Sequence, residues 1–244
     1  MPDRIFADPR LAAVYDAFDG TRDDLDLYVG LVDEIGARTV LDVGCGTGSL
    51  ACRLALAGVE VVGVDPAQAS LDVARRKPGA DRVRWVHGVA AEVGPTGVDL
   101  AVMTGNVAQV FVDDEDWATT LAAIATSLRP DGWLAFETRD PARRAWERWT
   151  PERTRRTLDV LGVGEATAWT ELLSVDEPLV SFRHHWRFAA DGAHLTSDST
   201  LRFRTQDELR SILATAGFTV TDVRDAPDRP GLEWVFLARC SGSG

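Results

Sequence analysis

Short β-branched runs alternate with helical stretches from about residue 39 onward, and this alternation constrains the fold more than any other feature of the sequence. Strands are expected in TVLDV, EVVGVD, RVRWVHG, VDLAVMTG and WLAFETR, and helices near 48–57, near 67–76 and over DEDWATTLAAIATSLRPDG. Strands separated by helices imply parallel βαβ crossovers. We therefore expect an α/β fold with a doubly wound parallel sheet, five strands of which are complete by residue 138.

The pattern changes after residue 138. Residues 139–157 are rich in arginine with helical spacing, and the segments TAWTELLSV, LVSFRHHWRF and HLTSDSTLRFRT then alternate with period two. Asp191-Gly192 is a hairpin signal. These features predict a helix and an antiparallel β-meander inserted into the main domain, which a helix near 205–216 and the strands FTVTDVRD and LEWVFLAR then complete.

Composition narrows the function classes. A formal net charge of −12 disfavours nucleic acid as a partner, because like charges repel. No apolar stretch approaches the roughly 20 residues that span a bilayer, and the three cysteines have no metal-like spacing. Lys77 is the only lysine, which removes most mechanisms that need a lysine nucleophile. We expect a cytoplasmic protein that acts on a small molecule without a metal, and a homodimer is compatible with the sequence.

The first strand runs into a glycine loop, VLDVGCGTGSL, over residues 40–50. The dinucleotide fingerprint Gly-x-Gly-x-x-Gly would need a glycine at 49, where Ser49 stands. The pattern Leu-Asp-Val-Gly-Cys-Gly-Thr-Gly instead resembles motif I of the class I S-adenosylmethionine-dependent methyltransferases. The resemblance implies that S-adenosylmethionine is the cofactor. It also implies cofactor contacts from Asp42, Gly44, Cys45, Gly46, Thr47 and Gly48.

These residue types suit that ligand physically. Glycines allow positive φ and a close approach of the ligand to the backbone, and the following helix points its N-terminus at a carboxylate. Asp42 stands at the carboxyl end of the first strand, where open α/β sheets bind ligands, and can hold an ammonium group. A side chain at Gly46 would enter the ligand.

Asp65 ends the second strand about 20 residues after the glycines, the separation at which an acidic side chain can accept both ribose hydroxyls. The resemblance implies the same role, with Pro66 beside it. The alternative is that Asp65 only caps a helix that begins at Pro66. Both roles can hold together.

The adenine and methyl ends of the site are less defined. The family commonly has Gly-Asp after the third strand, but this chain has Gly88-Val89-Ala90, so we expect adenine to lie against the backbone of Val89 and Ala90, with Glu92 as a further candidate. The resemblance implies that the segment after the fourth strand, MTGNVAQVF, lies over the cofactor. Contacts are accordingly expected from Thr104, Gly105 and Asn106, although Asn106 and Gln109 are also explained by a polar loop that satisfies its own hydrogen bonds.

Three further residues are candidates near the transferred methyl group. Tyr15 and Tyr28 lie in an N-terminal stretch that resembles the helical lid of small-molecule methyltransferases, where they would cover the sulfonium; helix packing is the alternative. Strand alternation places His184 on one face with Phe182 and Trp186, which makes His184 the candidate base or a buried structural histidine. Arg139 ends the fifth strand and is a candidate contact for an anionic substrate.

The resemblance completes the expected fold and function. It implies a Rossmann-like seven-stranded sheet of order 3-2-1-4-5-7-6, with helices on both faces and the last strand antiparallel. The expected divisions are an N-terminal lid (1–38), the cofactor-binding core (39–138), the inserted subdomain (139–204) and the completion of the core (205–240). The activity would be methyl transfer to a nitrogen or oxygen of a small metabolite. The alternatives are a non-catalytic protein that binds the adenosyl ligand and a nicotinamide-dependent oxidoreductase.

Overall fold

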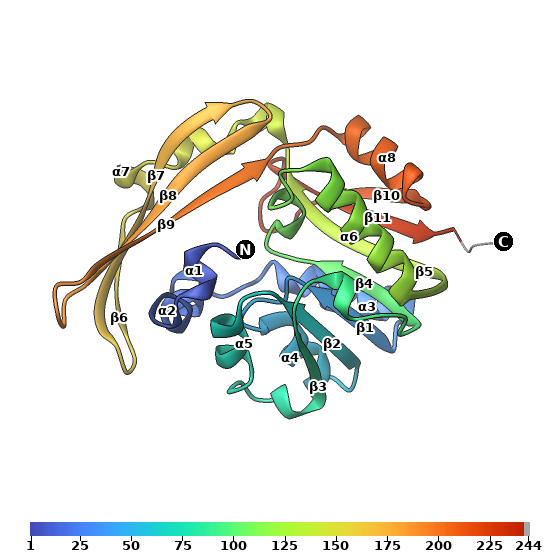
Figure 1. The fold of residues 1–244 in the computed structure, drawn as a ribbon, viewed down its shortest axis with the longest axis horizontal. Helices are drawn as coiled ribbons and strands as arrows, with labels where there is room; N and C mark the ends of the chain where they lie inside the picture. The colour runs from blue at the N-terminus through green and yellow to red at the C-terminus, as the bar shows by residue number, and fades with distance from the viewer. Residues whose placement is uncertain (242–244) are drawn as a thin grey trace.

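Two β-sheets organise the chain, and the computed structural model describes residues 1–241 of it (Figure 1). The larger sheet has seven strands in the order β10-β11-β5-β4-β1-β2-β3. Its strands are β1 (Thr39–Val43), β2 (Glu60–Asp65), β3 (Val83–His87), β4 (Val98–Met103), β5 (Leu128–Arg139), β10 (Phe218–Asp225) and β11 (Glu233–Cys240).

The pairing of these strands confirms the expected fold class. β1 is parallel to β2 and β4, β2 to β3, and β4 to β5. β11 is antiparallel to both β5 and β10. With only the strands of this sheet counted, the order reads 3-2-1-4-5-7-6, as expected. Connections leave β1 and β4 in opposite directions along the sheet, so the switch point at which α/β sheets bind ligands lies between these two strands.

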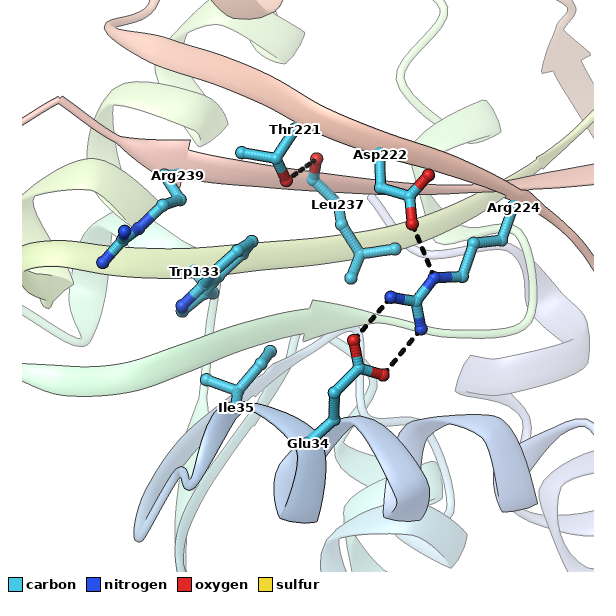
Figure 2. Close-up of a pocket in the computed structure, with 8 residues that line it drawn as sticks. All are labelled: Glu34, Ile35, Trp133, Thr221, Asp222, Arg224, Leu237 and Arg239. Carbon is cyan, nitrogen blue, oxygen red and sulfur yellow. Dashed lines mark hydrogen bonds and ion pairs between the residues drawn. The ribbon is translucent and has the colours of Figure 1, made fainter.

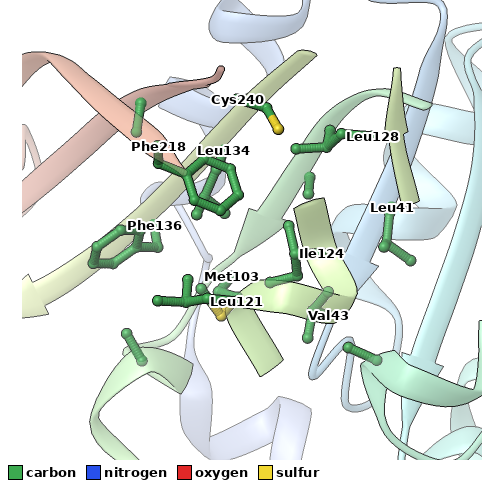
Figure 3. Close-up of a cluster of buried hydrophobic side chains, with 14 of the residues drawn as sticks. Leu41, Val43, Met103, Leu121, Ile124, Leu128, Leu134, Phe136, Phe218 and Cys240 are labelled. Carbon is green, nitrogen blue, oxygen red and sulfur yellow. The ribbon is translucent and has the colours of Figure 1, made fainter. Parts of the chain in front are cut away.

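Helices cover both faces of the larger sheet. Successive residues of a strand point to opposite faces, so Val40 packs with α3 (Leu25–Ile35) and α4 (Ser49–Leu56), whereas Leu41 packs with α6 (Asp114–Ser127) and α8 (Gln206–Thr215). Figure 3 shows the cluster of buried side chains around Leu41, in which Leu121 and Ile124 of α6 lie among residues of the strands. α5 (Gln68–Ala74) follows β2, and short 3₁₀ turns occupy Ala80–Arg82, Ala90–Glu92 and Val107–Gln109. Among the described residues, no helix is long and apolar enough to cross a membrane.

The second sheet is the expected antiparallel meander with one more strand than the sequence indicated. Its order is β6-β7-β8-β9, with bounds β6 (Arg156–Val160), β7 (Gly164–Asp176), β8 (Leu179–Phe188) and β9 (His194–Arg202). One face packs on the N-terminal helices α1 (Arg4–Ala7) and α2 (Pro9–Asp19). The ring of Phe18 meets that of Trp186 edge-on at 4.6 Å. The sheet therefore lies against the N-terminal helices, which in turn reach the larger sheet's helices (Figure 1).

The expected continuous helix within 139–157 was wrong. The segment contains only single turns, at Pro141–Arg143, Ala145–Arg148 and α7 (Pro151–Thr154). Arg144 adopts a left-handed conformation with φ 45°, which interrupts a right-handed helix. Trp146 and Trp149 pack instead on Phe182 and Phe203, so tertiary contacts with the second sheet override the helical spacing.

Candidate active site

The three glycines of the first loop have different neighbours. Gly44, Gly46 and Gly48 all have positive φ, at 70°, 52° and 75°. A Cβ on Gly44 would lie 2.7 Å from Val107, and one on Gly48 would lie 2.5 Å from Trp85, so these two glycines permit packing within the protein. A Cβ on Gly46 would meet no protein atom within 4 Å. Only Gly46 therefore borders open space, as a close approach of a ligand requires.

Asp42 presents an unpaired buried oxygen beside this loop. The residue is 1% exposed, and its Oδ1 has no hydrogen-bond partner. Burial raises the pKa of Asp42 to about 7, and the charge of Asp65 adds to the rise while Arg22 opposes it. A buried acceptor without a donor is costly unless a ligand supplies one. The ammonium group of a methionine moiety fits this requirement.

Asp65 joins the second strand to the glycine loop. Its Oδ2 accepts the Gly46 N–H at 2.8 Å and its Oδ1 accepts the Ala67 N–H at 2.7 Å. Burial raises the pKa of Asp65 above its usual value. Each carboxylate oxygen keeps a second lone pair, so the side chain can still accept hydroxyl groups. Pro66 is not the first helical residue, because α5 begins at Gln68.

The turn after β3 offers an apolar side chain more readily than a free backbone donor. The Val89 side chain is 53% exposed, and Ala90 is buried. The Val89 N–H donates to Glu92 Oε2 at 2.8 Å. The carboxylate of Glu92 is thus already engaged with the turn, which weakens its candidacy as a contact for the adenine amino group.

The loop after β4 borders open space on the other side of the switch point. Gly105 has φ 68°, and a Cβ placed there would meet nothing within 4 Å. Asn106, with φ 63°, is buried and donates from Nδ2 to Glu233 Oε2 at 3.2 Å, which leaves its Oδ1 without a partner. Thr104 precedes them and is partly exposed. Gly46 and Gly105 therefore open toward space from adjacent strands, β1 and β4.

The two tyrosines have separate environments. Tyr28 of α3 is fully buried in the hydrophobic cluster between this helix and the larger sheet. Its hydroxyl donates to Glu137 Oε2 at 3.1 Å, so we assign Tyr28 to the core. Tyr15 on α2 packs on Phe6 with ring centroids 5.5 Å apart. Burial raises the pKa of the Tyr15 phenol, and Asp19 adds to the rise while Arg22 and Arg139 oppose it. Charged groups at the end of α2, in the loop after it and at the end of β5 therefore act on Tyr15.

The N-terminal helices contact the glycine loop at Thr47, a predicted cofactor contact, through Asp16 and Lys77, which the sequence analysis did not assign to the site. The Thr47 hydroxyl donates to Asp16 Oδ1 at 2.5 Å, and Lys77 Nζ lies 2.7 Å from Asp16 Oδ2. Lys77 also donates to Ser49 at 2.8 Å. A hollow of about 280 Å³ adjoins this contact and is lined by Asp16, Arg22, Ser49 and Lys77 among others. Arg22 is held by Asp19 and Asp24.

A larger hollow of about 410 Å³ lies apart from the glycine loop. It is lined by Glu34 of α3, Trp133 of β5, and residues of β10 and β11 including Arg224 and Arg239 (Figure 2). Trp133 pairs with Leu100 in the first half of β4, and Glu34 lies at the end of α3, just before β1 begins. The hollow is therefore on the amino-terminal side of the parallel strands, whereas α/β sheets bind ligands at the carboxyl ends of their strands. This hollow is therefore not part of the candidate site.

His184 lies in a polar band on the inner face of the second sheet. Its neighbours across β7 and β9 are Thr170 and Ser197, and its Nδ1 lies 3.1 Å from the Thr170 hydroxyl. Burial lowers the pKa of His184 to about 4, with a smaller contribution from His185, so the imidazole is neutral at pH 7. The same face carries an apolar cluster on either side of this band, one around Trp186 and one around Phe182.

Arg139 is committed to contacts within the protein. Its Nη1 donates to Gln109 Oε1 at 2.9 Å, and its Nε lies 3.3 Å from Glu233 Oε1. The guanidinium carbon lies 5.6 Å from the ring of Trp149. These contacts join the loop after β4, the end of β5 and the segment before the second sheet, so Arg139 acts as a structural connection between them.

Comparisons with known proteins agree with this geometry. The family model described as "Methyltransferase domain" matches residues 40–132. An uncharacterized methyltransferase of Mycobacterium tuberculosis is 30% identical over 195 residues, which cover 73% of this chain and 74% of that protein. The cypemycin N-terminal methyltransferase of a Streptomyces species is 35% identical over 109 residues, and the match spans 44% of each protein.

Solved structures share the fold over almost the whole chain. The amino pentose methyltransferase CalS10 of Micromonospora echinaspora, solved with S-adenosylmethionine bound, superposes with a TM-score of 0.70 at 22% identity, covering 93% of this chain and 96% of that one. The orphaned oxygen of Asp42 and the open side of Gly46 suit the same cofactor. The chain therefore belongs to the class I S-adenosylmethionine-dependent methyltransferases, and S-adenosylmethionine is its methyl donor.

Proposed function

We propose that the protein transfers the methyl group to a nitrogen or oxygen atom of a small metabolite. The observation that carries the proposal is the pair of open glycines, Gly46 and Gly105, at the carboxyl ends of adjacent strands, with the unpaired oxygen of Asp42 beside them. When bound, the cofactor supplies an electrophilic methyl group on a sulfonium sulfur. The chain has mainly to align a nucleophile with it and exclude water.

The proposed cofactor contacts follow the order of the strands. Asp42 holds the methionine ammonium, and the N-terminus of α4 faces the carboxylate. The backbone of residues 44–48 lies along the ligand at the N-terminus of α4. Asp65 accepts the ribose hydroxyls. Val89 and Ala90 pack on the adenine, and residues 104–106 lie beside the methyl group with Tyr15 over it.

The inner face of the second sheet is the proposed acceptor surface. The Thr170 hydroxyl and the His184 imidazole lie in one row with Ser197, whose buried hydroxyl accepts the Ile5 N–H at 2.8 Å. Aromatic side chains lie on either side of this row. Such a surface offers hydrogen bonds and apolar contact to a small organic molecule. The strongly negative net charge disfavours nucleic acid as an acceptor. Two of the three similar proteins are named as an amino pentose methyltransferase and an N-terminal methyltransferase, and these names support an amine among the candidates.

His184 is the proposed general base. In the tautomer whose Nδ1–H donates to the Thr170 hydroxyl oxygen, the neutral imidazole leaves Nε2 unprotonated, so Nε2 can accept a proton from the attacking group. His184→Gln should lower the turnover number about 10²-fold to 10⁴-fold and leave cofactor affinity unchanged. His185→Gln is the matched control, since the adjacent side chain faces the other side of the strand and binds Glu171 and His194.

A screen tests the proposed function directly. The protein is incubated with S-adenosylmethionine and a panel of small amines, alcohols, phenols and carboxylic acids, and formation of S-adenosylhomocysteine is measured. We expect acceptor-dependent formation with an amine or hydroxyl compound. Turnover only with a macromolecular acceptor would contradict the proposal. Unchanged turnover in His184→Gln would contradict only the assignment of His184 as the general base.

A further inference from the structure

The loop after β4 forms an anion-binding concavity. Gly105 and Asn106 are consecutive residues in the left-handed region, with φ 68° and 63°. Successive backbone N–H groups of a turn can converge on one point and bind an anion there. Here both N–H groups donate to the same atom, Oε1 of Glu137, at 2.7 Å and 3.3 Å. The concavity is therefore filled by a carboxylate of the chain itself.

Glu137 is fixed from the opposite side as well. Its Oε2 accepts the Tyr28 hydroxyl at 3.1 Å, and the side chain is 3% exposed. The preceding residue, Phe136, pairs with Met103, the last residue of β4. Strand register thus brings Glu137 directly under the loop that follows β4. The carboxylate links α3 to this loop and has no freedom to reach a ligand.

The loop follows the carboxyl end of β4, beside the carboxyl end of β1, where the proposed function puts the cofactor and the transfer space. A Cβ on Gly105 would meet no protein atom within 4 Å, and the same holds for Gly46 in the loop after β1. The position of the 104–106 backbone therefore sets one boundary of that space. Because Glu137 holds two successive N–H groups of this backbone, it determines where the boundary lies.

Several charged or titratable groups surround Glu137. Glu233 faces it from β11, Asp24 and Tyr28 from the α3 side, Arg229 from the loop before β11, and Arg139 from its own strand. Burial raises the pKa of Glu137 to about 7, and Glu233 and Asp24 add to the rise, whereas the Gly105 N–H and Arg229 oppose it. Near neutrality the carboxylate thus exists in both protonation states, and the proton removes the charge that strengthens its two backbone hydrogen bonds.

We infer that Glu137 is a positioning residue for methyl transfer, whose ionised carboxylate fills the concavity of Gly105 and Asn106 and holds that loop at the edge of the transfer space. The inference rests on the proposed function, which identifies that space as the place where the methyl group is transferred. Glu137 acts only through the loop and touches neither cofactor nor acceptor. A neutral side chain at this position leaves the loop less firmly held.

The loop can be followed without cofactor or acceptor. In ¹⁵N-labelled protein, the amide resonances of Gly105 and Asn106 should titrate between pH 5.5 and 8.5 with a midpoint near 7. In Glu137→Gln, which has the same shape without the charge, both resonances should be independent of pH and lie near the low-pH limit of the wild type. Resonances that do not move in the wild type, or that titrate equally in the variant, would overturn the inference.

Ligand binding gives the second measurement. At pH 8, where Asp42 is ionised in both proteins, Glu137→Gln should bind S-adenosylhomocysteine at least fivefold more weakly than the wild type in calorimetry. Tyr28→Phe is the matched control, because it removes the other hydrogen bond of Glu137 and leaves the loop contacts in place; its affinity should stay within twofold. Equal affinity of Glu137→Gln and the wild type would overturn the positioning role. Absence of binding by the wild type would instead contradict the proposed function, while the amide titration would still decide whether Glu137 holds the loop.

Discussion

The backbone N–H of Gly46 donates to Oδ2 of Asp65 at 2.8 Å, so one hydrogen bond joins the glycine loop after β1 to the end of β2. Gly46 is the loop glycine that borders open space, and Asp65 is buried with its charge turned toward that loop. This bond fixes the distance between the two segments before a ligand arrives. Preorganisation of this kind lowers the entropic cost of binding.

Asp65→Asn tests the proposed ribose contact. The amide keeps an oxygen that accepts the Ala67 N–H, but its NH2 group cannot accept the Gly46 N–H, and the side chain loses its charge and half of its acceptor capacity for hydroxyl groups. Hydrogen bonds to charged groups contribute about 1.5–3 kcal/mol, so we expect roughly 10-fold to 100-fold weaker binding of S-adenosylhomocysteine in calorimetry. Asp72→Asn on the exposed side of α5 is the matched control and should bind as the wild type does. Equal affinity in the two variants would place the ribose elsewhere.

Gly46→Ala tests the close approach of the cofactor to the backbone. The new Cβ meets no protein atom, so its cost to folding is the left-handed conformation alone, about 1–2 kcal/mol. Gly58→Ala is matched in both respects, since Gly58 has φ 91° and nothing within 4 Å of a Cβ. We expect similar thermal destabilisation in both variants, together with at least tenfold weaker cofactor binding in Gly46→Ala only. If both variants retain affinity, the ligand does not lie against Gly46.

The sequence predicts the parts of this molecule that depend on local pattern. Alternating strands and helices indicated β1 to β5, and the glycine spacing, read with the family resemblance, indicated the cofactor and the sheet order. The unpaired Asp42 and the open Gly46 lie within this predictable part. Period-two alternation likewise placed His184 on the face that carries Phe182 and Trp186.

What the sequence did not predict depends on contacts between distant residues. Glu137 receives its hydrogen bonds from Tyr28, which is 109 positions away, and from the loop at 105–106. Asn106 and Glu233 are 127 positions apart. No periodicity reports such pairs. The prediction of a helix over 139–157 failed for the same reason. Packing of Trp146 and Trp149 on the second sheet stabilises this segment more than a continuous helix would.

Trp186→Ala should weaken the attachment of the second sheet to the N-terminal helices. Trp186 is buried against the ring of Phe18 at 4.6 Å, and removing a buried tryptophan costs about 3–5 kcal/mol of unfolding free energy. Trp169→Ala is the control, since Trp169 lies on the outer face of the same sheet, stacked on His185, and is only partly buried. Urea denaturation should show a clearly smaller loss for Trp169→Ala. Equal losses would contradict the assignment of the inner face.

The raised pKa of Asp42 predicts opposite effects of pH on stability and on cofactor binding. Because the folded-state pKa of about 7 exceeds the unfolded value of 3.8, the folded protein holds an extra proton between them, and this group lowers the free energy of unfolding as pH rises from about 4 to about 7. Glu137 acts in the same direction, whereas His184, with its pKa lowered to about 4, acts in the opposite direction up to pH 6.5. The difference in unfolding free energy between the wild type and Asp42→Asn isolates the contribution of Asp42. As pH rises from about 4 to about 7, the wild type should lose stability relative to this variant.

Binding should follow the ionised form of Asp42, because only the carboxylate pairs with the ammonium group. The affinity of the wild type for S-adenosylhomocysteine should therefore increase from pH 6 to pH 8, by up to about tenfold for each unit below the pKa. In Asp42→Asn the affinity should be lower, and the part of the pH dependence that Asp42 contributes should be absent. Calorimetry at several pH values in buffers of different ionisation enthalpy checks this, since proton release accompanies binding only where Asp42 is protonated beforehand. A wild-type affinity that falls as pH rises, or the same proton release in Asp42→Asn, would contradict the assignment of the ammonium group to Asp42.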